Sequence, residues 1–295
     1  MVRGLPAGIE PGGRYASWEA TPPAYVVCDV DGTLVGPSDR ASETVASAVA
    51  RAQAAGIRVG FATGRMRRAV EPLWRQVRAR GPHVLHNGAE VRGDGVTLAS
   101  WPVAPDRIDA LVEIAASRAD AYLEVYTEDG YLVSARDDRA RPHWRILGAP
   151  PDGVITNARD LDGAPVLKAT FAIFDPESVP AIERAVTAVG LAAGAAGSPL
   201  TPTLSYVNAT DPRVDKGRAL EYAAGHLGLE LEQVAAIGDA TNDLSMLAVA
   251  GTAIAMGQAP EVVRRAAHLV VPSVDDNGVA VALDAVVAWA GATAR

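Results

Sequence analysis

Blocks of hydrophobic and polar positions follow one another along the chain in a way that predicts an α/β protein. A short apolar run that ends in carboxylates at residues 25–29 is typical of a buried parallel strand. Apolar residues four apart then predict a helix over 42–55, which Gly56 ends. A strand, a helix and a strand are expected next, at 57–61, 66–80 and 83–86. This alternation predicts a Rossmann-like open parallel sheet with crossover helices.

The pattern changes after Asn87 and Gly88. Strands and helices are now mixed, with strands expected at 96–100, 121–126, 131–134 and 166–174 and helices at 105–118 and 176–189. The Gly- and Ala-rich residues 190–199 predict a weak edge strand followed by a loop. This mixture indicates a second α/β unit inserted into the first.

Strand–helix alternation resumes in the last third of the chain. Helices are expected at 216–227, 242–249, 260–267 and 279–289, and strands at 234–238, 252–255 and 269–271. The simplest account is a core of residues 24–89 and 206–295, interrupted by an inserted unit of residues 90–205. Residues 1–23 contain Pro, Gly and scattered charges and are expected to form a flexible N-terminal extension.

Composition and charge exclude several classes of protein. With 295 residues, 49% hydrophobic and 21% charged, the chain is globular and long enough for about two domains. Its net charge of −8 disfavours nucleic-acid and anionic membrane partners. No apolar run approaches the ~20 residues of a membrane span, and the single cysteine, Cys28, has no partner for an internal disulfide. We therefore expect a cytoplasmic protein, either a monomer or a small homo-oligomer.

Lysine is rare in this arginine-rich chain: among 27 basic residues, the lysines are Lys168 and Lys216. Lys216 follows Asp215 at a predicted helix start, where a positive charge opposes the helix dipole by ~0.3–1 kcal/mol. That position favours a chemical role for Lys216. Lys168 begins an apolar strand of the insert and is a candidate substrate-binding residue, with a structural role as the competing interpretation.

Carboxylates follow two strands of the predicted parallel sheet. Asp29 and Asp31 close the first strand, and Asp239 and Asp243 follow the strand at 234–238. The carboxyl ends of parallel strands on either side of a switch point face one crevice. Carboxylates so placed repel one another unless a cation lies between them, and Mg²⁺ prefers such oxygen ligands. Turn formation or helix capping explains each residue singly, but not the combined set.

Two further elements belong to the same crevice. Thr63, Gly64 and Arg65 offer a hydroxyl and backbone N–H groups ahead of a helix, which is an anion-binding arrangement, although a plain helix cap also fits. Lys216 offers a compact charge that could neutralise a phosphoryl oxygen or a carboxylate. A cysteine phosphatase is excluded, because six positions after Cys28 the chain has Leu34 rather than arginine.

Four short motifs resemble, in order and spacing, those of the haloacid dehalogenase-like phosphohydrolases: Asp29-Val30-Asp31-Gly32-Thr33, Thr63-Gly64-Arg65, Lys216-Gly217 and the segment 238–243. A large insert between the second and third motifs is similar to that of the Cof-type subfamily. The segments Asn87-Gly88-Ala89 and Asp276-Asn277-Gly278-Val279 are similar as well. The likeness spans about residues 24–290 and implies an α/β core with an inserted α/β cap that determines specificity.

The resemblance implies a Mg²⁺-dependent phosphomonoesterase acting on a small phosphorylated metabolite, such as a sugar phosphate or a phosphorylated cofactor. Asp29 would be the nucleophile that forms an aspartyl-phosphate, and Asp31 the general acid and then the base. Thr63 and Lys216 would hold the phosphoryl oxygens. Further phosphate or substrate binding would come from Gly32, Gly64, Arg65, Asn242 and Lys168. The Mg²⁺ ligands would be Asp29, the main-chain carbonyl of Asp31, Asp239 and Asp243, the last directly or through water.

Two other functions stay open at this point. A phosphomutase would use the same core and would isomerise its substrate without releasing phosphate. A non-catalytic metabolite-binding protein is disfavoured, because the residues that would serve as nucleophile and acid are both present.

Overall fold

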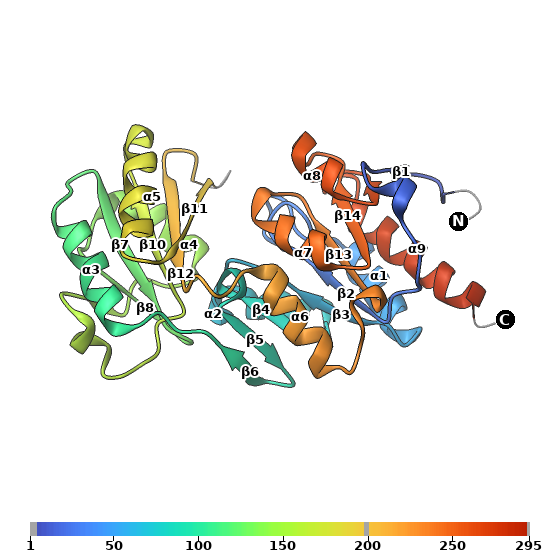
Figure 1. The fold of residues 1–295 in the computed structure, drawn as a ribbon, viewed down its shortest axis with the longest axis horizontal. Coiled ribbons are helices and arrows are strands. Elements are labelled where there is room, and N and C mark those ends of the chain that lie inside the picture. Colours follow the sequence, from blue (N-terminus) through green and yellow to red (C-terminus); the bar gives the residue numbers. More distant parts are fainter. Residues whose placement is uncertain (1–4, 198–200, 294–295) are drawn as a thin grey trace. The chain divides into compact units, whose positions relative to one another are not determined.

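The computed structural model describes residues 5–197 and 201–293, which form two compact units (Figure 1). The core unit contains the described residues up to Gly64, the segment Pro72–Ala99 and the described residues from Asp215 onward. The cap unit contains Arg65–Glu71 and Ser100–Val214. The predicted α/β class is confirmed: each unit combines a sheet with helices.

A six-stranded sheet forms the centre of the core unit, in the order β1-β15-β14-β13-β2-β3. All neighbours pair in parallel except β1 and β15. The parallel strands are β2 (Tyr25–Cys28), β3 (Arg58–Phe61), β13 (Val234–Gly238), β14 (Thr252–Met256) and β15 (Leu269–Val271). Most of their residues are buried, because helices cover both faces of such a sheet. Continuous apolar runs were therefore the correct signal for these strands.

A helix follows each of these strands: α1 (Glu43–Ala54), α2 (Arg67–Val77), α7 (Leu244–Val249), α8 (Glu261–Ala266) and α9 (Gly278–Thr293); α6 (Lys216–His226) precedes β13. Helix α1 begins where Ser42 Oγ accepts the Val45 N–H at 3.1 Å. It packs against α9, and Arg51 pairs with Asp284 there through two hydrogen bonds of 2.8 and 2.9 Å (Figure 1). Helix α2 contains one boundary between the units, at Pro72.

A second, three-stranded sheet of the core unit consists of β4 (His83–Leu85), β5 (Glu90–Gly93) and β6 (Val96–Ser100). A parallel bridge between Ala62 and Val84 aligns β4 with the residue that follows β3. Residues 90–99 are expected in the insert from the sequence, whereas β5 pairs with the core strand β4 and the segment belongs to the core unit. Their short β-hairpin pattern does not reveal which sheet they join.

The cap unit contains a six-stranded sheet in the order β11-β12-β10-β7-β8-β9. The strands are β7 (Ala121–Tyr126), β8 (Tyr131–Val133), β9 (Gly153–Val154), β10 (Lys168–Ile173), β11 (Ala192–Gly197) and β12 (Ser205–Thr210). Strand β12 was expected to belong to the core, but it pairs with β10 over five residues. Its position explains why the cap unit extends to Val214 rather than to residue 205.

Helices α3 (Pro105–Ala116) and α5 (Val179–Ala188) pack on one face of the cap sheet, and α4 (Arg141–Ile146) was not predicted. Ile108 and Leu111 of α3 and Ile182 of α5 are fully buried against Leu123 and Phe171 of the sheet. Short 3₁₀ turns complete the two units, at Tyr15–Ser17, His86–Gly88, Asp138–Ala140, Ala158–Leu161, Pro176–Ser178, Leu231–Gln233 and Thr241–Asp243.

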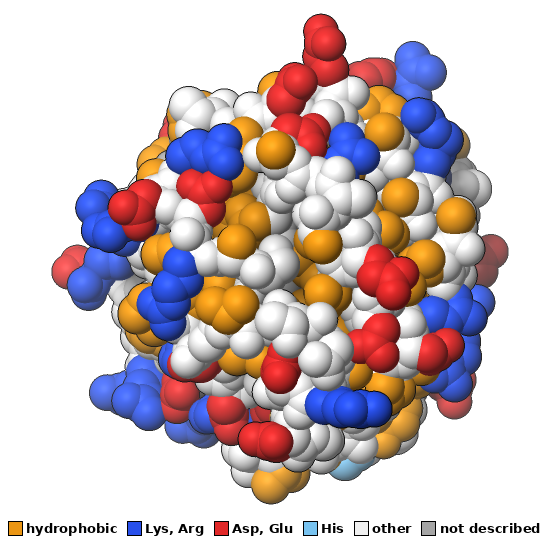
Figure 2. Space-filling view, turned by 90° about the vertical axis from the view of Figure 1, so that its left-hand side faces the viewer, with side chains coloured by type: hydrophobic (Ala, Val, Ile, Leu, Met, Phe, Trp, Pro, Cys, Tyr) orange, Lys and Arg blue, Asp and Glu red, His pale blue; other side chains and the backbone are white. Residues whose placement is uncertain are grey.

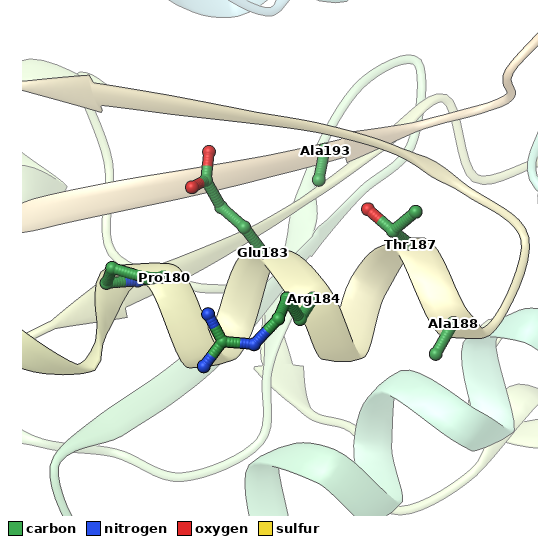
Figure 3. A pocket seen from close by; sticks show the side chains of 6 residues that line it. All are labelled: Pro180, Glu183, Arg184, Thr187, Ala188 and Ala193. Carbon is green, nitrogen blue, oxygen red and sulfur yellow. The ribbon is translucent and has the colours of Figure 1, made fainter.

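The predicted edge strand at 190–199 is β11, and its small side chains leave the strand edge poorly covered. A hollow between β11 and α5 is lined by Pro180, Glu183, Arg184, Thr187, Ala188 and Ala193 (Figure 3). In this view Glu183 points toward the strand, where its Oε1 accepts the Ala195 N–H at 3.0 Å. A carboxylate on an edge N–H discourages pairing with a further strand. The predicted loop residues 198 and 199 lie outside the described residues.

The surface of the described residues mixes charges of both signs. On the face drawn in Figure 2, basic and acidic side chains are interspersed, with apolar side chains in small groups between them. No helix in residues 5–197 or 201–293 is long and apolar enough to cross a lipid bilayer.

The described part of the N-terminal segment, which begins at residue 5, differs from the expected flexible extension. Residues 1–4 of that extension lie outside the described residues. Strand β1 (Glu10–Pro11) pairs with β15, and the Gly12 N–H donates to the His268 carbonyl at 2.8 Å. Trp18 stacks on His268 and meets Trp289 edge-on, and its indole N–H donates to the Gly251 carbonyl at 3.0 Å. Residues 10–18 thus make specific contacts with the core unit, although the segment has no hydrophobic periodicity.

We expect Trp18→Ala to lower the free energy of unfolding by about 2 kcal/mol, because it removes a half-buried aromatic side chain and its hydrogen bond. Urea denaturation followed by far-UV circular dichroism measures this loss. Glu19→Ala, at the exposed neighbouring position, is the matched control and leaves the midpoint unchanged. Equal midpoints for Trp18→Ala and the wild type would show that the segment does not stabilise the core unit.

Candidate active site

The loop after β2 carries the first pair of predicted site residues. Asp29 is 5% exposed, and its N–H donates to the Ile237 carbonyl of β13 at 2.8 Å. Asp31, two residues further, is exposed. Gly32 has a φ of +85°, and a Cβ there would lie 2.4 Å from Asp239 Oδ2. A glycine at this position therefore permits both the turn and the approach of a second carboxylate.

The loop after β13 is organised around Asp243, whose side chain is fully buried. Its Oδ2 accepts the N–H groups of Asp239 and Ala240, both at 3.0 Å. A Cβ on Gly238 would lie 2.6–2.7 Å from the Asp243 side chain, so the strand must end in glycine for this carboxylate to fit. The loop thereby directs Asp239 toward the loop after β2.

Lys216 joins the two loops. Its ammonium donates to Asp29 Oδ1 and to Asp243 Oδ1, both at 2.6 Å, and the side chain is 1% exposed. Asp215 caps α6 by accepting the Arg218 N–H at 2.9 Å, which places Lys216 in the first turn. Burial acts to lower the pKa of Lys216, but Asp243 and Asp29 outweigh it and raise the pKa above its usual value. The lysine therefore stays charged.

The carboxylates outnumber the lysine. One carboxylate oxygen each of Asp29, Asp239 and Asp243 lies within 4.8 Å of the others. Burial, and then the charge of Asp243, raises the pKa of Asp29 well above its ordinary value, although Lys216 acts in the opposite direction. Burial is also the main cause of the raised pKa of Asp239. Three carboxylates against one ammonium leave a formal charge of −2, which matches a divalent cation with oxygen ligands, so these residues fit Mg²⁺.

Two residues that support this cluster were not singled out from the sequence. Thr33 Oγ1 donates to Asp239 Oδ1 at 2.7 Å. Gln258 Nε2 donates to the Gly32 carbonyl at 2.5 Å, and its Oε1 accepts the Val274 N–H at 3.2 Å. Thr33 ends the motif Asp29-Val30-Asp31-Gly32-Thr33, which is the sequence signal for it. Gln258 lies outside every motif, and its sequence neighbours contain no signal for it.

Of the predicted phosphate-binding residues, Thr63 and Asn242 belong to the core unit and Arg65 to the cap unit. Thr63 follows β3 and is fully buried, and its N–H donates to the Val84 carbonyl at 2.9 Å. Asn242 is exposed, and its Nδ2 lies 3.5 Å from Asn87 Oδ1. Arg65 is 8% exposed and belongs to the cap unit by its contacts, so its phosphate-binding role stays a prediction.

Lys168 lies in the cap sheet, on β10 opposite Tyr126 of β7. Its ammonium lies 4.5 Å from the centre of the Tyr126 ring. Glu124, two residues before Tyr126 on β7, is buried. It accepts hydrogen bonds from Tyr122 and Tyr126, and its Oε1 lies 3.1 Å from His143 Nδ1. Burial acts to raise the pKa of Glu124, but His143 and the two hydroxyls lower it below its usual value. The cap unit thus holds a buried carboxylate with a lowered pKa on the strand that pairs with that of Lys168.

Comparison with proteins of known sequence finds phosphatases that are similar over most of this chain. The relatives include 5-amino-6-(5-phospho-D-ribitylamino)uracil phosphatase YwtE of Bacillus subtilis (strain 168), 28% identical over 88% of this chain and 96% of that protein. HMP-PP phosphatase of Cronobacter sakazakii is 27% identical over 82% of this chain and 87% of its own length.

Solved structures agree on the fold. A hypothetical protein from Geobacillus kaustophilus HTA426 superposes with a TM-score of 0.74 at 25% identity, over 88% of this chain and 97% of that one. A haloacid dehalogenase-like hydrolase from Bacteroides thetaiotaomicron has a TM-score of 0.77 at 23% identity, over 88% and 98% of the two chains. A family model described as haloacid dehalogenase-like hydrolase matches residues 26–283. The resemblance seen in the four motifs is therefore confirmed, and the chain belongs to the haloacid dehalogenase-like hydrolases.

Proposed function

We propose that this haloacid dehalogenase-like phosphatase hydrolyses small phosphorylated metabolites in a Mg²⁺-dependent reaction with Asp29 as its nucleophile. The observation that carries the proposal is the buried ammonium of Lys216, 2.6 Å from both Asp29 and Asp243, within a cluster of three carboxylates. The names of the two relatives support the substrate class, because each names a small phosphorylated compound.

The reaction begins with attack of an Asp29 carboxylate oxygen on phosphorus, which breaks the bond to the ester oxygen and leaves an aspartyl-phosphate. Asp31 gives its proton to the departing alkoxide. In the second step ionised Asp31 takes a proton from water, and the resulting hydroxide attacks phosphorus. The bond between phosphorus and Asp29 breaks, inorganic phosphate leaves, and both carboxyl groups return to their starting states.

The surrounding residues prepare Asp29 for this role. Lys216 stabilises the ionised, nucleophilic form of Asp29 through its hydrogen bond, against the opposing effect of burial. Thr63 and Lys216 would bind the phosphoryl oxygens as charge develops on them. Gln258 fixes the carbonyl of Gly32 and thereby the loop that carries Asp31.

Mg²⁺, when bound, would neutralise the charge of the phosphoryl oxygens and of the carboxylates around it. Asp29 and Asp239 are the side chains best suited to hold it directly. Both oxygens of Asp243 already accept hydrogen bonds, from Lys216 and from the backbone of its own loop. We therefore assign Asp243 to positioning the ligands, with contact to the ion through water.

The cap unit would select the leaving group. Lys168 is our candidate there, because it is a cation on the cap sheet whose ammonium lies 4.5 Å from the centre of the Tyr126 ring. A cap that closes over the substrate also excludes water from the reacting phosphoryl group.

Substitutions of the two catalytic carboxyl groups test the mechanism. We expect Asp29→Asn to reduce phosphate release from p-nitrophenyl phosphate in the presence of Mg²⁺ at least about 10³-fold, because the amide is a poor nucleophile. Asp31→Asn loses general acid–base catalysis, and its rate of phosphate release should fall by about 10²–10⁴-fold. Steady-state assays of released nitrophenolate and phosphate measure both effects.

Asp94→Asn, in the exposed turn between β5 and β6, is the matched control and keeps wild-type turnover. Full turnover by Asp29→Asn would contradict the assignment of the nucleophile. With a sugar phosphate as substrate, isomerisation without free phosphate would instead identify a phosphomutase.

The metal site can be tested without an activity assay. In EDTA at pH 7 we expect Asp239→Asn to unfold at a higher temperature than the wild type, because the raised pKa of Asp239 means that its ionisation destabilises the fold. A carboxyl group whose pKa is raised by folding destabilises the folded state least when it is protonated. The difference in melting temperature between Asp239→Asn and the wild type should therefore shrink as the pH falls through that raised pKa toward 4.

Added Mg²⁺ should reverse the order of the two melting temperatures, so that the wild type melts above Asp239→Asn. At about 100 times its Kd, a ligand adds about 2.7 kcal/mol to the free energy of unfolding, and the wild type should gain more of this than Asp239→Asn. Differential scanning fluorimetry measures the melting temperatures. Equal shifts with Mg²⁺ in both proteins would remove Asp239 from the proposed ligand set.

A further inference from the structure

The turn between β4 and β5 has an unusual backbone. His86, Asn87 and Gly88 follow one another with φ values of +52°, +58° and +108°. The left-handed region is costly for residues other than glycine, at about 1–3 kcal/mol each when the surroundings impose it. Two such residues in succession persist only where neighbouring contacts hold them.

These contacts come from both ends of the proposed phosphate site. The Asn87 N–H donates to the Thr63 carbonyl at 3.0 Å, which ties the turn to the residue after β3. Gly88 packs on the peptide that joins Asp215 to Lys216: a Cβ on Gly88 would lie 2.3 Å from the Asp215 carbonyl oxygen. The turn therefore touches the backbone of both Thr63 and Lys216.

A polar cluster of the buried Glu90 and Arg92 with Thr97 lies beside His86, the first residue of the turn. The His86 imidazole is fully buried, with Nε2 3.9 Å from Glu90 Oε2. Glu90 Oε1 accepts hydrogen bonds from Arg92 at 2.7 Å and from Thr97 at 2.8 Å. Burial therefore confines the His86 ring, which lies beside this cluster at the start of the turn.

The Asn87 amide lies between two loops assigned to phosphate binding. A Cβ on Gly64 would lie 2.8 Å from Asn87 Oδ1, so the amide packs directly on Gly64. On its other side Asn242 Nδ2 donates to the same oxygen at 3.5 Å, a long hydrogen bond. Asn87 is half-buried. The backbone of Asn87 therefore holds Thr63, while its side chain contacts Gly64 and Asn242.

We infer that Asn87 is a positioning residue for phosphoryl transfer, which holds the loop of Thr63 and Gly64 and the side chain of Asn242 in the arrangement that binds the phosphoryl group. The inference rests on the proposed function. The competing explanation is that asparagine stands here because it tolerates the left-handed region better than most residues.

Glycine separates the two explanations. Asn87→Gly retains the left-handed backbone without a Cβ, but removes the amide. We expect the melting temperature to be equal to or above that of the wild type, and kcat/KM for p-nitrophenyl phosphate to fall about tenfold or more. Inhibition by inorganic phosphate should weaken in parallel, because the same loops bind the product.

A double-mutant cycle with Asn242→Ala tests whether the two amides act together. If Asn87 acts through Asn242, the loss caused by Asn87→Gly is smaller in the Asn242→Ala background than in the wild type. Asp94→Gly is the matched control: Asp94 has a φ of +51° in an exposed turn, so glycine relieves the same strain away from the site. Its kinetic constants should equal those of the wild type.

Three results would overturn the inference. They are wild-type kinetics for Asn87→Gly, a melting temperature for Asn87→Gly below that of the wild type, and full additivity with Asn242→Ala. A wild-type protein without Mg²⁺-dependent phosphatase activity would overturn the proposed function and this inference with it. An active wild type with an unaffected Asn87→Gly would overturn the inference alone.

Discussion

One buried ammonium holds the site together. Lys216 bonds to Asp29 and Asp243, which come from segments 187 and 27 residues away in the chain. Removing a lysine and two carboxylates from water costs several kcal/mol per ion, and this cost is offset only when the hydrogen bonds between them are well formed. The loops after β2 and β13 and the first turn of α6 must therefore meet in one arrangement. The remaining negative charge of the cluster provides the attraction for a divalent cation.

Backbone proximity makes that arrangement possible. Gly32, Gly88 and Gly238 each occupy a position where a Cβ would lie within 2.7 Å of an atom of the site or of its flanking backbone. At such distances a methyl group forces a loop to move, so larger residues at these positions act on geometry before they act on charge. The site is consequently built from close backbone contacts, with few long side chains that could adjust.

The parts of the fold that could be predicted were those whose pattern is local. The strand Val234–Gly238 was predicted with its observed bounds, because a buried parallel strand is a continuous apolar run with a polar end. The carboxylates after β2 and β13 were predicted to meet because the carboxyl ends of parallel strands on either side of a switch point face one crevice. Pairing between distant segments was not predictable: Ser205–Thr210 has the same local pattern in either unit, and only its pairing with β10 decides where it belongs.

Other features lacked a local pattern altogether. Trp18 is held by partners more than 230 residues away, and Gln258 by the carbonyl of Gly32, so no window of sequence contains either contact. Asn87 was noticed as part of a family-like segment, but its contacts depend on two consecutive left-handed residues that the sequence does not specify. Residues that act through position rather than through chemical type are the hardest to recognise in this way.

The burial of both lysines changes what the folded surface offers to other molecules. Lys216 is 1% and Lys168 7% exposed, so no lysine amine is presented to solvent. Apart from histidine, the positive side-chain charge available to a partner comes from guanidinium groups, which remain charged at every physiological pH and bind carboxylates with two hydrogen bonds. Acetylation or ubiquitination of a lysine side chain would require local unfolding. Control of this enzyme by such modifications would thus depend on the stability of the fold itself.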